Sequence, residues 1–130
     1  MRALAFADAD VRRRLETLLH PLIGAESARR AAAAGDATVV FDVPLLAEST
    51  HWRDRVERIL VVDCRAETQV ERVAARPGWD RATALRVVAQ QSGRAERRAI
   101  ADAVLFNDGL GLAELERELR TLWRRWTGAR

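Results

Sequence analysis

The stretch "TVVFDVPLLAES", residues 38–49, is a short apolar run that ends in an acid and a proline. The run up to Asp42 is rich in β-branched residues and nearly continuous, which is typical of a parallel strand covered on both faces. Pro44 has no N–H to donate and therefore ends the ladder. We predict a buried strand at about 38–43, with Asp42 near its carboxyl end, where open α/β sheets bind their ligands.

Two later runs have the same character. The stretch "HWRDRVERILVVDC", residues 51–64, predicts a strand at about 58–63 that again ends in an acid, Asp63. The stretch "AVLFND" predicts a third strand at about 103–107. Segments with helical periodicity separate the three runs, and strands that alternate with helices indicate a parallel sheet flanked by helices, the α/β class.

The helical segments also have recognisable interruptions. Apolar residues recur at helical spacing between Val11 and Leu22, and we expect this amphipathic helix to break at His20–Pro21. A second helix should follow and end at Gly35. Asp80 is expected to cap a helix that breaks at Ser92–Gly93 and then resumes.

Composition restricts the class of protein. With 130 residues, 48% hydrophobic and 32% charged, the chain has room for one soluble domain with a core. No apolar run approaches the roughly 20 residues of a membrane-spanning helix. There is no basic start followed by an apolar segment, and the single cysteine, Cys64, fits a reducing compartment. We therefore expect a cytoplasmic protein with no membrane partner.

The high isoelectric point, about 10.7, is at first sight a sign of nucleic-acid binding. The formal net charge is only +3, however, and all 22 basic residues are arginine, with no lysine and no tyrosine. A small excess of arginine raises the isoelectric point strongly because almost nothing else titrates at alkaline pH. Aromatic residues, on which bases could stack, make up 5% of the chain. We expect no nucleic-acid partner, and an arginine-rich nucleic-acid-binding domain remains the less favoured alternative.

Five strings, in order, resemble the dephospho-coenzyme A kinase family of the P-loop kinase superfamily: "LHPLI", "VVFDVPLLAES", "VVDCRAETQVERVAAR", "VVAQQ" and "RRAIADAVLFNDG". The resemblance implies a three-layer α/β/α fold with a parallel sheet. It also implies ATP-dependent phosphorylation of the ribose 3′-hydroxyl of dephospho-coenzyme A, with Mg²⁺ carried by ATP. Dephospho-coenzyme A and ATP are then the expected partners, and the two histidines and one cysteine are not expected to form a metal site of their own.

One departure from the family is large. The phosphate-cradling segment G-x-x-x-x-G-K-[ST] does not occur in these residues, which include no lysine. We therefore expect an amino-terminally truncated kinase without its first, central strand, its P-loop and its second strand, and we expect the chain alone to be inactive. The alternative is a non-catalytic binding or assembly remnant. Self-association through the exposed strand edges is expected in either case.

The resemblance also suggests how the chain is organised. Residues 1–130 would form a single partial kinase domain. Within it, residues at about 1–36 would be a helical segment on the substrate side, and residues at about 77–98 a lid-like helical segment.

Matching positions suggest the residues of the site. Asp42 would be an acid near the phosphates, and arginines would neutralise the transferring phosphoryl group. We expect Arg72 and Arg76 to share one face of a helix because they are four residues apart. The expected catalytic residues are Asp42, Arg72, Arg76 and Arg97.

The remaining matches concern binding. The histidine-proline pair and the "PLL-x-E" segment lie on the acceptor-substrate side in this family, and the last strand and the lid contact the nucleotide. The expected substrate-binding residues are His20, Pro44, Leu45, Leu46 and Glu48. The expected nucleotide-binding residues are Gln91, Asn107 and Gly109.

Overall fold

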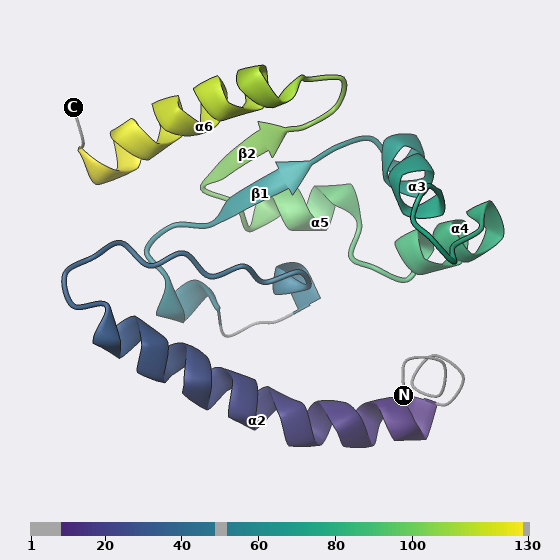
Figure 1. The fold of residues 1–130 in the computed structure, drawn as a ribbon, viewed down its shortest axis with the longest axis horizontal. Coiled ribbons are helices and arrows are strands. Elements are labelled where there is room, and N and C mark those ends of the chain that lie inside the picture. The colour runs from purple at the N-terminus through teal and green to yellow at the C-terminus, as the bar shows by residue number, and fades with distance from the viewer. Residues whose placement is uncertain (1–8, 49–51, 129–130) are drawn as a thin grey trace. The chain divides into compact units, whose positions relative to one another are not determined.

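A computed structural model describes residues 9–48 and 52–128 (Figure 1). The chain divides into two compact units, residues 1–42 and residues 43–130, and each is described by itself. The first unit contains the helix α2 (Ala9–Ala33). The second contains two short 3₁₀ turns, two strands and four helices: η1 (Leu46–Glu48), η2 (Arg53–Arg55), β1 (Leu60–Asp63), α3 (Ala66–Ala74), α4 (Arg81–Ala89), α5 (Arg94–Ala99), β2 (Ala103–Phe106) and α6 (Leu112–Thr127).

Helix α2 is continuous over 25 residues and contains Pro21 in its interior. The predicted break at His20–Pro21 is therefore wrong. Proline removes one backbone hydrogen bond, but the flanking alanine, leucine and arginine residues all favour the helix and keep it intact. The helix ends at Ala33, and Gly35 follows with φ of 58°, the left-handed conformation expected of a glycine after a helix.

Residues 38–43 have no regular secondary structure and belong to no sheet in the described part of the chain. Val40 is 76% exposed, and Asp42 is exposed as well. The prediction of a buried strand at 38–43 is therefore wrong. A strand needs a neighbour that accepts and donates its backbone hydrogen bonds, and no described segment takes that place. The apolar pattern indicated a preference for burial, but it could not supply the neighbour.

Strands β1 and β2 pair in parallel, with Leu60 opposite Ala103 and Asp63 opposite Phe106. The predicted strands at 58–63 and 103–107 are confirmed to within two residues, and so is the α/β class with a parallel sheet. Parallel strands require a crossover connection, which α3, α4 and α5 provide here.

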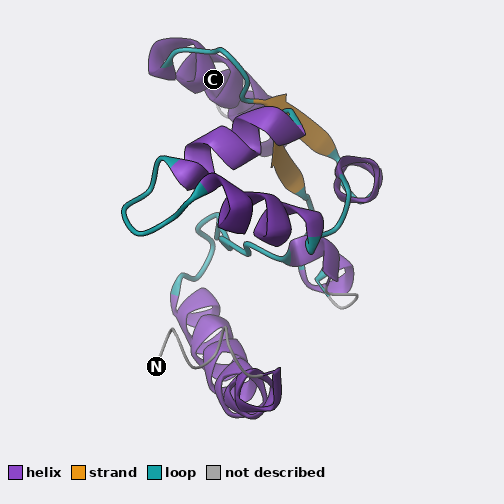
Figure 2. Ribbon diagram, turned by 90° about the vertical axis from the view of Figure 1, so that its right-hand side faces the viewer, coloured by secondary structure: helices purple, strands orange, loops and turns teal. Residues whose placement is uncertain are grey.

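The helices of the second unit cover this small sheet. Helix α5 lies against β1 and α6 lies against β2, while α3 and α4 pack against each other (Figures 1 and 2). Asp80 caps α4 by accepting a hydrogen bond from the backbone N–H of Thr83 at 2.6 Å, and the predicted break at Ser92–Gly93 separates α4 from α5. Both predictions are confirmed.

The apolar core of the second unit is small. Its buried members come from both strands, from the residues on either side of β1, and from α3 and α4: Ile59, Val61, Cys64, Val70, Ala84 and Leu105. No helix in the described ranges is both long enough and apolar enough to cross a bilayer.

Candidate functional site

The carboxyl ends of β1 and β2 meet at one edge of the sheet, because the strands are parallel. The backbone N–H of Asn107 donates to the backbone oxygen of Asp63 at 2.7 Å and holds the two ends together. Asp63, Asn107 and Asp108 are thus neighbours at the edge where α/β proteins bind their ligands. We call these residues, with the arginines that contact them, the strand-end cluster: Asp63, Arg65, Arg72, Arg94, Asn107 and Asp108.

Asp63 is the most deeply buried acid of the cluster, with a side chain only 1% exposed. Arg94, at the start of α5, donates to both of its carboxylate oxygens, at 3.0 Å from Nε and 2.6 Å from Nη2. The guanidinium of Arg94 also lies 5.8 Å from the centre of the Phe106 ring. The hydrogen bonds from Arg94 hold the pKa of the Asp63 carboxyl below its usual value, although burial opposes this. Asp63 therefore stays charged and fixes α5 to the strand.

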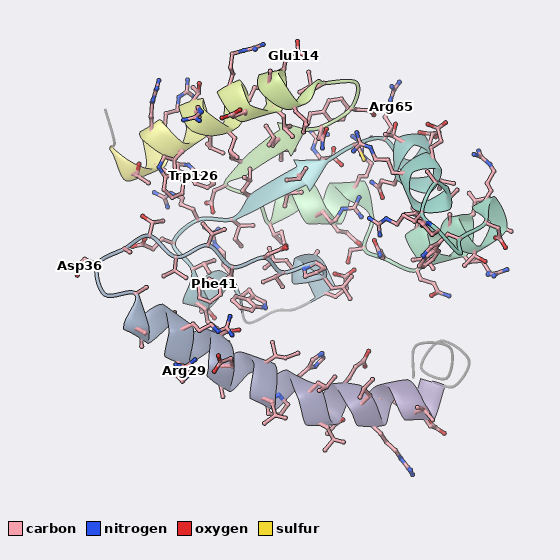
Figure 3. The ribbon with its side chains drawn as sticks, viewed as in Figure 1. Arg29, Asp36, Phe41, Arg65, Glu114 and Trp126 are labelled. Carbon is pink, nitrogen blue, oxygen red and sulfur yellow. The ribbon has the colours of Figure 1, made fainter. Side chains whose placement is uncertain are left out.

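Asp108 follows β2, and its carboxylate is hydrogen-bonded to residues at the start of α3. It accepts hydrogen bonds from the guanidinium of Arg65 at 2.8 Å, from the backbone N–H of Arg65 at 2.9 Å and from the hydroxyl of Thr68 at 3.0 Å. Figure 3 shows Arg65 where β1 leads into α3. These bonds, first of all that from the Arg65 side chain, hold the pKa of Asp108 well below its usual range. Gly109 follows with φ of 79°, a conformation that favours glycine in this turn.

Two of the expected site residues meet in this cluster. Arg72 on α3 donates to the side-chain oxygen of Asn107 at 3.4 Å. Arg76 does not share a helical face with Arg72, because α3 ends at Ala74 and Arg76 lies in the turn that follows. That expectation is wrong, and Pro77 gives a reason: the residue before a proline disfavours the helical conformation.

Three residues, from η1, from the turn before α5 and from α5 itself, are joined by hydrogen bonds. The backbone N–H of Ser92 donates to Oε1 of Glu48 at 2.9 Å, and the guanidinium of Arg97 donates to the backbone oxygen of Ser92. The Ser92 N–H is the main reason why the pKa of Glu48 is lowered, and the positive charge of Arg97 adds to it. Glu48 and Arg97, which are 49 residues apart in the sequence, are thus joined through one residue.

The other expected site residues lie outside these contacts. Gln91 is exposed in the turn after α4, and Pro44 and Leu45 are exposed just before the half-buried Leu46. His20 is exposed on α2 in the first unit, as is Asp42 at the end of that unit.

Reasoning from the sequence missed the two arginines that are paired with buried acids, Arg65 and Arg94. The sequence carried a partial signal for them. Asp63 was recognised as an acid at the end of a buried strand, and such an acid needs a cationic partner when it is buried. With 22 arginines in the chain, however, the partner could not be chosen without the crossover geometry.

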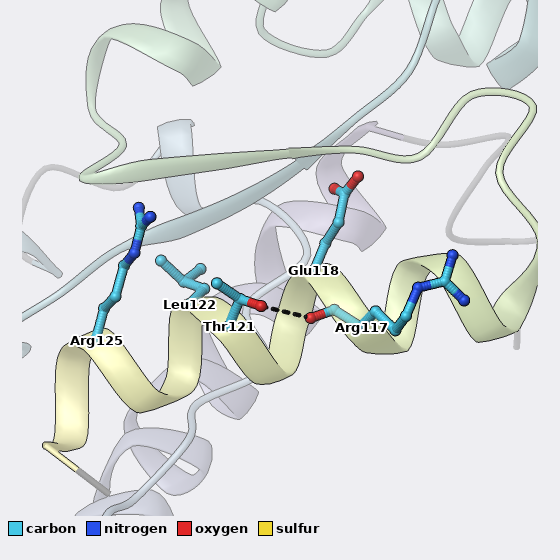
Figure 4. Close-up of a pocket in the computed structure, with 5 residues that line it drawn as sticks. All are labelled: Arg117, Glu118, Thr121, Leu122 and Arg125. Carbon is cyan, nitrogen blue, oxygen red and sulfur yellow. Dashed lines mark hydrogen bonds between the residues drawn. The ribbon is translucent and has the colours of Figure 1, made fainter. Parts of the chain in front are cut away.

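A shallow hollow on α6 is lined by Arg117, Glu118, Thr121, Leu122 and Arg125 (Figure 4). All five side chains come from one face of a single helix, and the hydroxyl of Thr121 is bonded to the backbone oxygen of Arg117 at 3.0 Å. Because no second element contributes a polar group, this hollow has none of the convergent chemistry of a binding site.

Comparisons with known proteins agree on one family. The family model described as dephospho-CoA kinase matches residues 1–112. The dephospho-CoA kinase of Burkholderia pseudomallei is 51% identical over 126 residues, which are 97% of this chain and 62% of that protein. The dephospho-CoA kinase of Bordetella pertussis is 47% identical over 127 residues, 97% of this chain and 59% of that protein.

A solved structure shows the same fold. A crystal structure of a protein from Thermus thermophilus matches with a TM-score of 0.73 and 33% sequence identity, over 97% of this chain and 66% of that one. The chain spans about three fifths of the length of the curated relatives that it matches. The extent of the family match, together with these identities, shows that the chain belongs to the dephospho-CoA kinase family.

Proposed function

We propose that this chain supplies the acceptor side and the lid side of a dephospho-CoA kinase, which transfers a phosphoryl group from ATP to the ribose 3′-hydroxyl of dephospho-CoA. In that reaction the hydroxyl oxygen forms a bond to the γ-phosphorus, the bond from phosphorus to the departing ADP breaks, and the hydroxyl proton leaves. Such transfers depend almost entirely on positioning and on stabilising negative charge.

The observation that carries the proposal is the convergence of arginines at the strand ends. Arg72 reaches this edge from α3, Arg94 lies at the start of α5, and the charge of Arg97, one turn further along α5, acts on Asp63. Arg94 is committed to Asp63, but Arg72 contacts only the neutral Asn107 among the partners described. A guanidinium has the planar fork that matches phosphate oxygens, so Arg72 is placed to exchange Asn107 for a phosphate.

The remaining residues keep the roles that the family resemblance gives them. Arg76 and Arg97 would add positive charge around the phosphates, and Gln91, Asn107 and Gly109 would face the nucleotide. His20 and the Pro44–Leu46 segment would face dephospho-CoA. Asp42 would be the acid near the phosphates.

The described residues do not by themselves fit a divalent cation. No three of their histidine, cysteine, aspartate or glutamate side chains come together as a metal-binding group. Asp63 and Asp108, the acids at the strand ends, are both occupied by arginine. We therefore derive no step through Mg²⁺ from these residues; a nucleotide would bring it as a complex with its own phosphates.

We also propose that these 130 residues alone do not turn over ATP, because they include no lysine and no G-x-x-x-x-G-K-[ST] segment to hold the phosphates. The test is an assay of the purified chain with ATP and dephospho-CoA, in which coenzyme A is detected by chromatography. We expect none. Turnover that Asp42→Asn abolishes would contradict this proposal.

Binding tests the functional assignment separately from turnover. We expect ATP to bind the chain in titration calorimetry, and Arg72→Ala to weaken that binding about tenfold, the effect of one charge-assisted hydrogen bond. Arg117→Ala, which removes an exposed arginine of α6, is the matched control and should leave the affinity unchanged. Equal affinities for ATP in the unmodified chain and in both variants would show that Arg72 does not contact the nucleotide.

A further inference from the structure

The Glu48–Ser92–Arg97 contact joins η1 to the turn between α4 and α5, through the side chain of Glu48 and the backbone of Ser92. Ser92 lies where α4 has ended and α5 has not yet begun. Its N–H is bonded to Glu48 and its carbonyl oxygen to Arg97, so that both backbone polar groups of this one residue are engaged by side chains of other segments. A residue in such a break is the natural hinge of a lid.

The carboxylate of Glu48 is engaged before any ligand arrives. Its Oε1 accepts the Ser92 N–H at 2.9 Å, and the hydroxyl of Ser92 and the charge of Arg97 act on the same carboxylate. Both groups favour the charged form of Glu48. A carboxylate that is already bonded to the chain's own backbone, and that carries a negative charge itself, is poorly placed to meet a substrate that carries phosphates.

We propose that Glu48 is a positioning residue, which ties the 44–48 segment to the hinge at Ser92 and so sets the placement of Arg97, and that it does not contact the acceptor itself. The inference rests on the proposed function for the role of Arg97, but the tie is a property of the chain without ligand. Leu46 and Ala47, which precede Glu48 in η1, are half-buried and hold this segment against the rest of the unit. Because the Glu48 carboxylate is bonded to Ser92, a movement of the segment would also move Ser92.

The hydrogen bonds of Ser92 are continued by bonds at the start of α5. The backbone N–H of Arg97 donates to the backbone oxygen of Gly93 at 3.0 Å, which is the first turn of this short helix. The Gly93 N–H is bonded to Glu96 at 2.8 Å. The position of Ser92 therefore determines where this turn begins, and with it the direction of the Arg97 side chain.

Hydrogen exchange of the 130-residue chain without ligand tests the proposal. In Glu48→Ala we expect the amides of Ser92 and Arg97 to exchange about tenfold faster, which corresponds to the loss of one hydrogen bond to a charged acceptor. In Glu48→Gln the side-chain oxygen still accepts the Ser92 N–H, and exchange should return to within about threefold of the unmodified chain. Glu118→Ala on α6 is the control and should leave both amides unchanged.

Exchange at Arg97 that is the same in Glu48→Ala and in the unmodified chain would overturn the proposal. So would a Glu48→Ala variant that loses affinity for dephospho-CoA while its hinge amides keep their rates, because Glu48 would then act by direct contact. If dephospho-CoA binds none of these proteins, the proposed function fails on the acceptor side. The exchange rates without ligand still decide whether Glu48 holds the hinge.

Discussion

Two segments of this chain have a similar pattern of apolar residues and different structures. Residues 38–43 and residues 59–63 are both short apolar runs with an aspartate near the end. The second run contains β1, whose Asp63 is buried and paired with Arg94. The first run has no regular secondary structure, belongs to no described sheet, and leaves Asp42 exposed.

The difference shows what a strand pattern contains and what it lacks. The pattern states that a segment would gain from burial on both faces. It does not state which neighbour will satisfy the backbone, and β1 exists because β2 offers a matching ladder from Leu60 to Asp63. Likewise, an aspartate at a strand end is buried only where an arginine meets it, as Arg94 meets Asp63.

The largest expected contrast is in backbone protection. We expect the amides of Val61 and Asp63 to exchange on the order of a hundredfold more slowly than those of Val39 and Val40, because only the former point towards the partner strand β2. Hydrogen exchange read by NMR measures both pairs in one sample. Equal protection of the two segments would mean that residues 38–43 find a strand neighbour in solution.

Protection that appears only at high concentration would identify that neighbour as a second copy of the chain. Sedimentation velocity over the same concentrations would then show a dimer or a larger species. A monomer at all concentrations would contradict the expected self-association through exposed strand edges.

The second contrast compares the two acids. Asp63→Ala should lower the free energy of unfolding by about 2–3 kcal/mol, because it leaves Arg94 without its buried partner. The value lies below that of a fully buried pair since the Arg94 side chain is 35% exposed and water can reach it. Asp42→Ala should change the same quantity by less than about 0.5 kcal/mol, as is usual at exposed sites. Urea unfolding followed by circular dichroism measures both, and a similar loss in the two variants would remove the distinction between the acids.

These comparisons also explain which parts of the structure could be predicted from the sequence. The α/β class, β1, β2 and the break at Ser92–Gly93 could be predicted, because each depends on a local pattern of apolar, capping or helix-breaking residues. The pairing of Asp63 with Arg94 and the hydrogen bond between Ser92 and Glu48 could not, because each joins residues that are distant in the sequence. The continuity of α2 through Pro21 was missed for a different reason: the favourable propensity of a whole helix outweighed one unfavourable residue.

The third contrast concerns the apolar residues of the two runs. Val61→Ala removes two methyl groups from a side chain that is 9% exposed, and should cost about 1.5–2 kcal/mol of unfolding free energy. Val40→Ala changes a side chain that already meets water and should have almost no effect. The two variants remove the same chemical groups. A difference between their urea unfolding midpoints therefore reports the difference in burial of Val61 and Val40. A loss in Val40→Ala as large as that in Val61→Ala would show that residues 38–43 are covered in solution.

The smallest expected effect concerns acid, and it tests how the beginning of β1 is held. Asp102 accepts hydrogen bonds from Arg53 and, at 2.7 Å, from the backbone N–H of Ile59, the residue just before the strand. The Arg53 side chain and then the Ile59 N–H lower the pKa of Asp102 from 3.8 to about 2.

Because the pKa of Asp102 is lower in the folded chain, its contribution to stability is complete above about pH 4 and is lost as the pH falls towards 2. With its side chain 22% exposed, solvent screening reduces that contribution to about 1–2 kcal/mol. In Asp102→Asn the amide cannot titrate, so the chain should be less stable at pH 6 and should lose less stability than the unmodified chain between pH 4 and 2. Urea unfolding at a series of pH values measures both slopes. Parallel slopes would show that the Arg53–Asp102 contact does not hold the start of β1, and that the pairing with β2 alone separates this strand from the exposed run at 38–43.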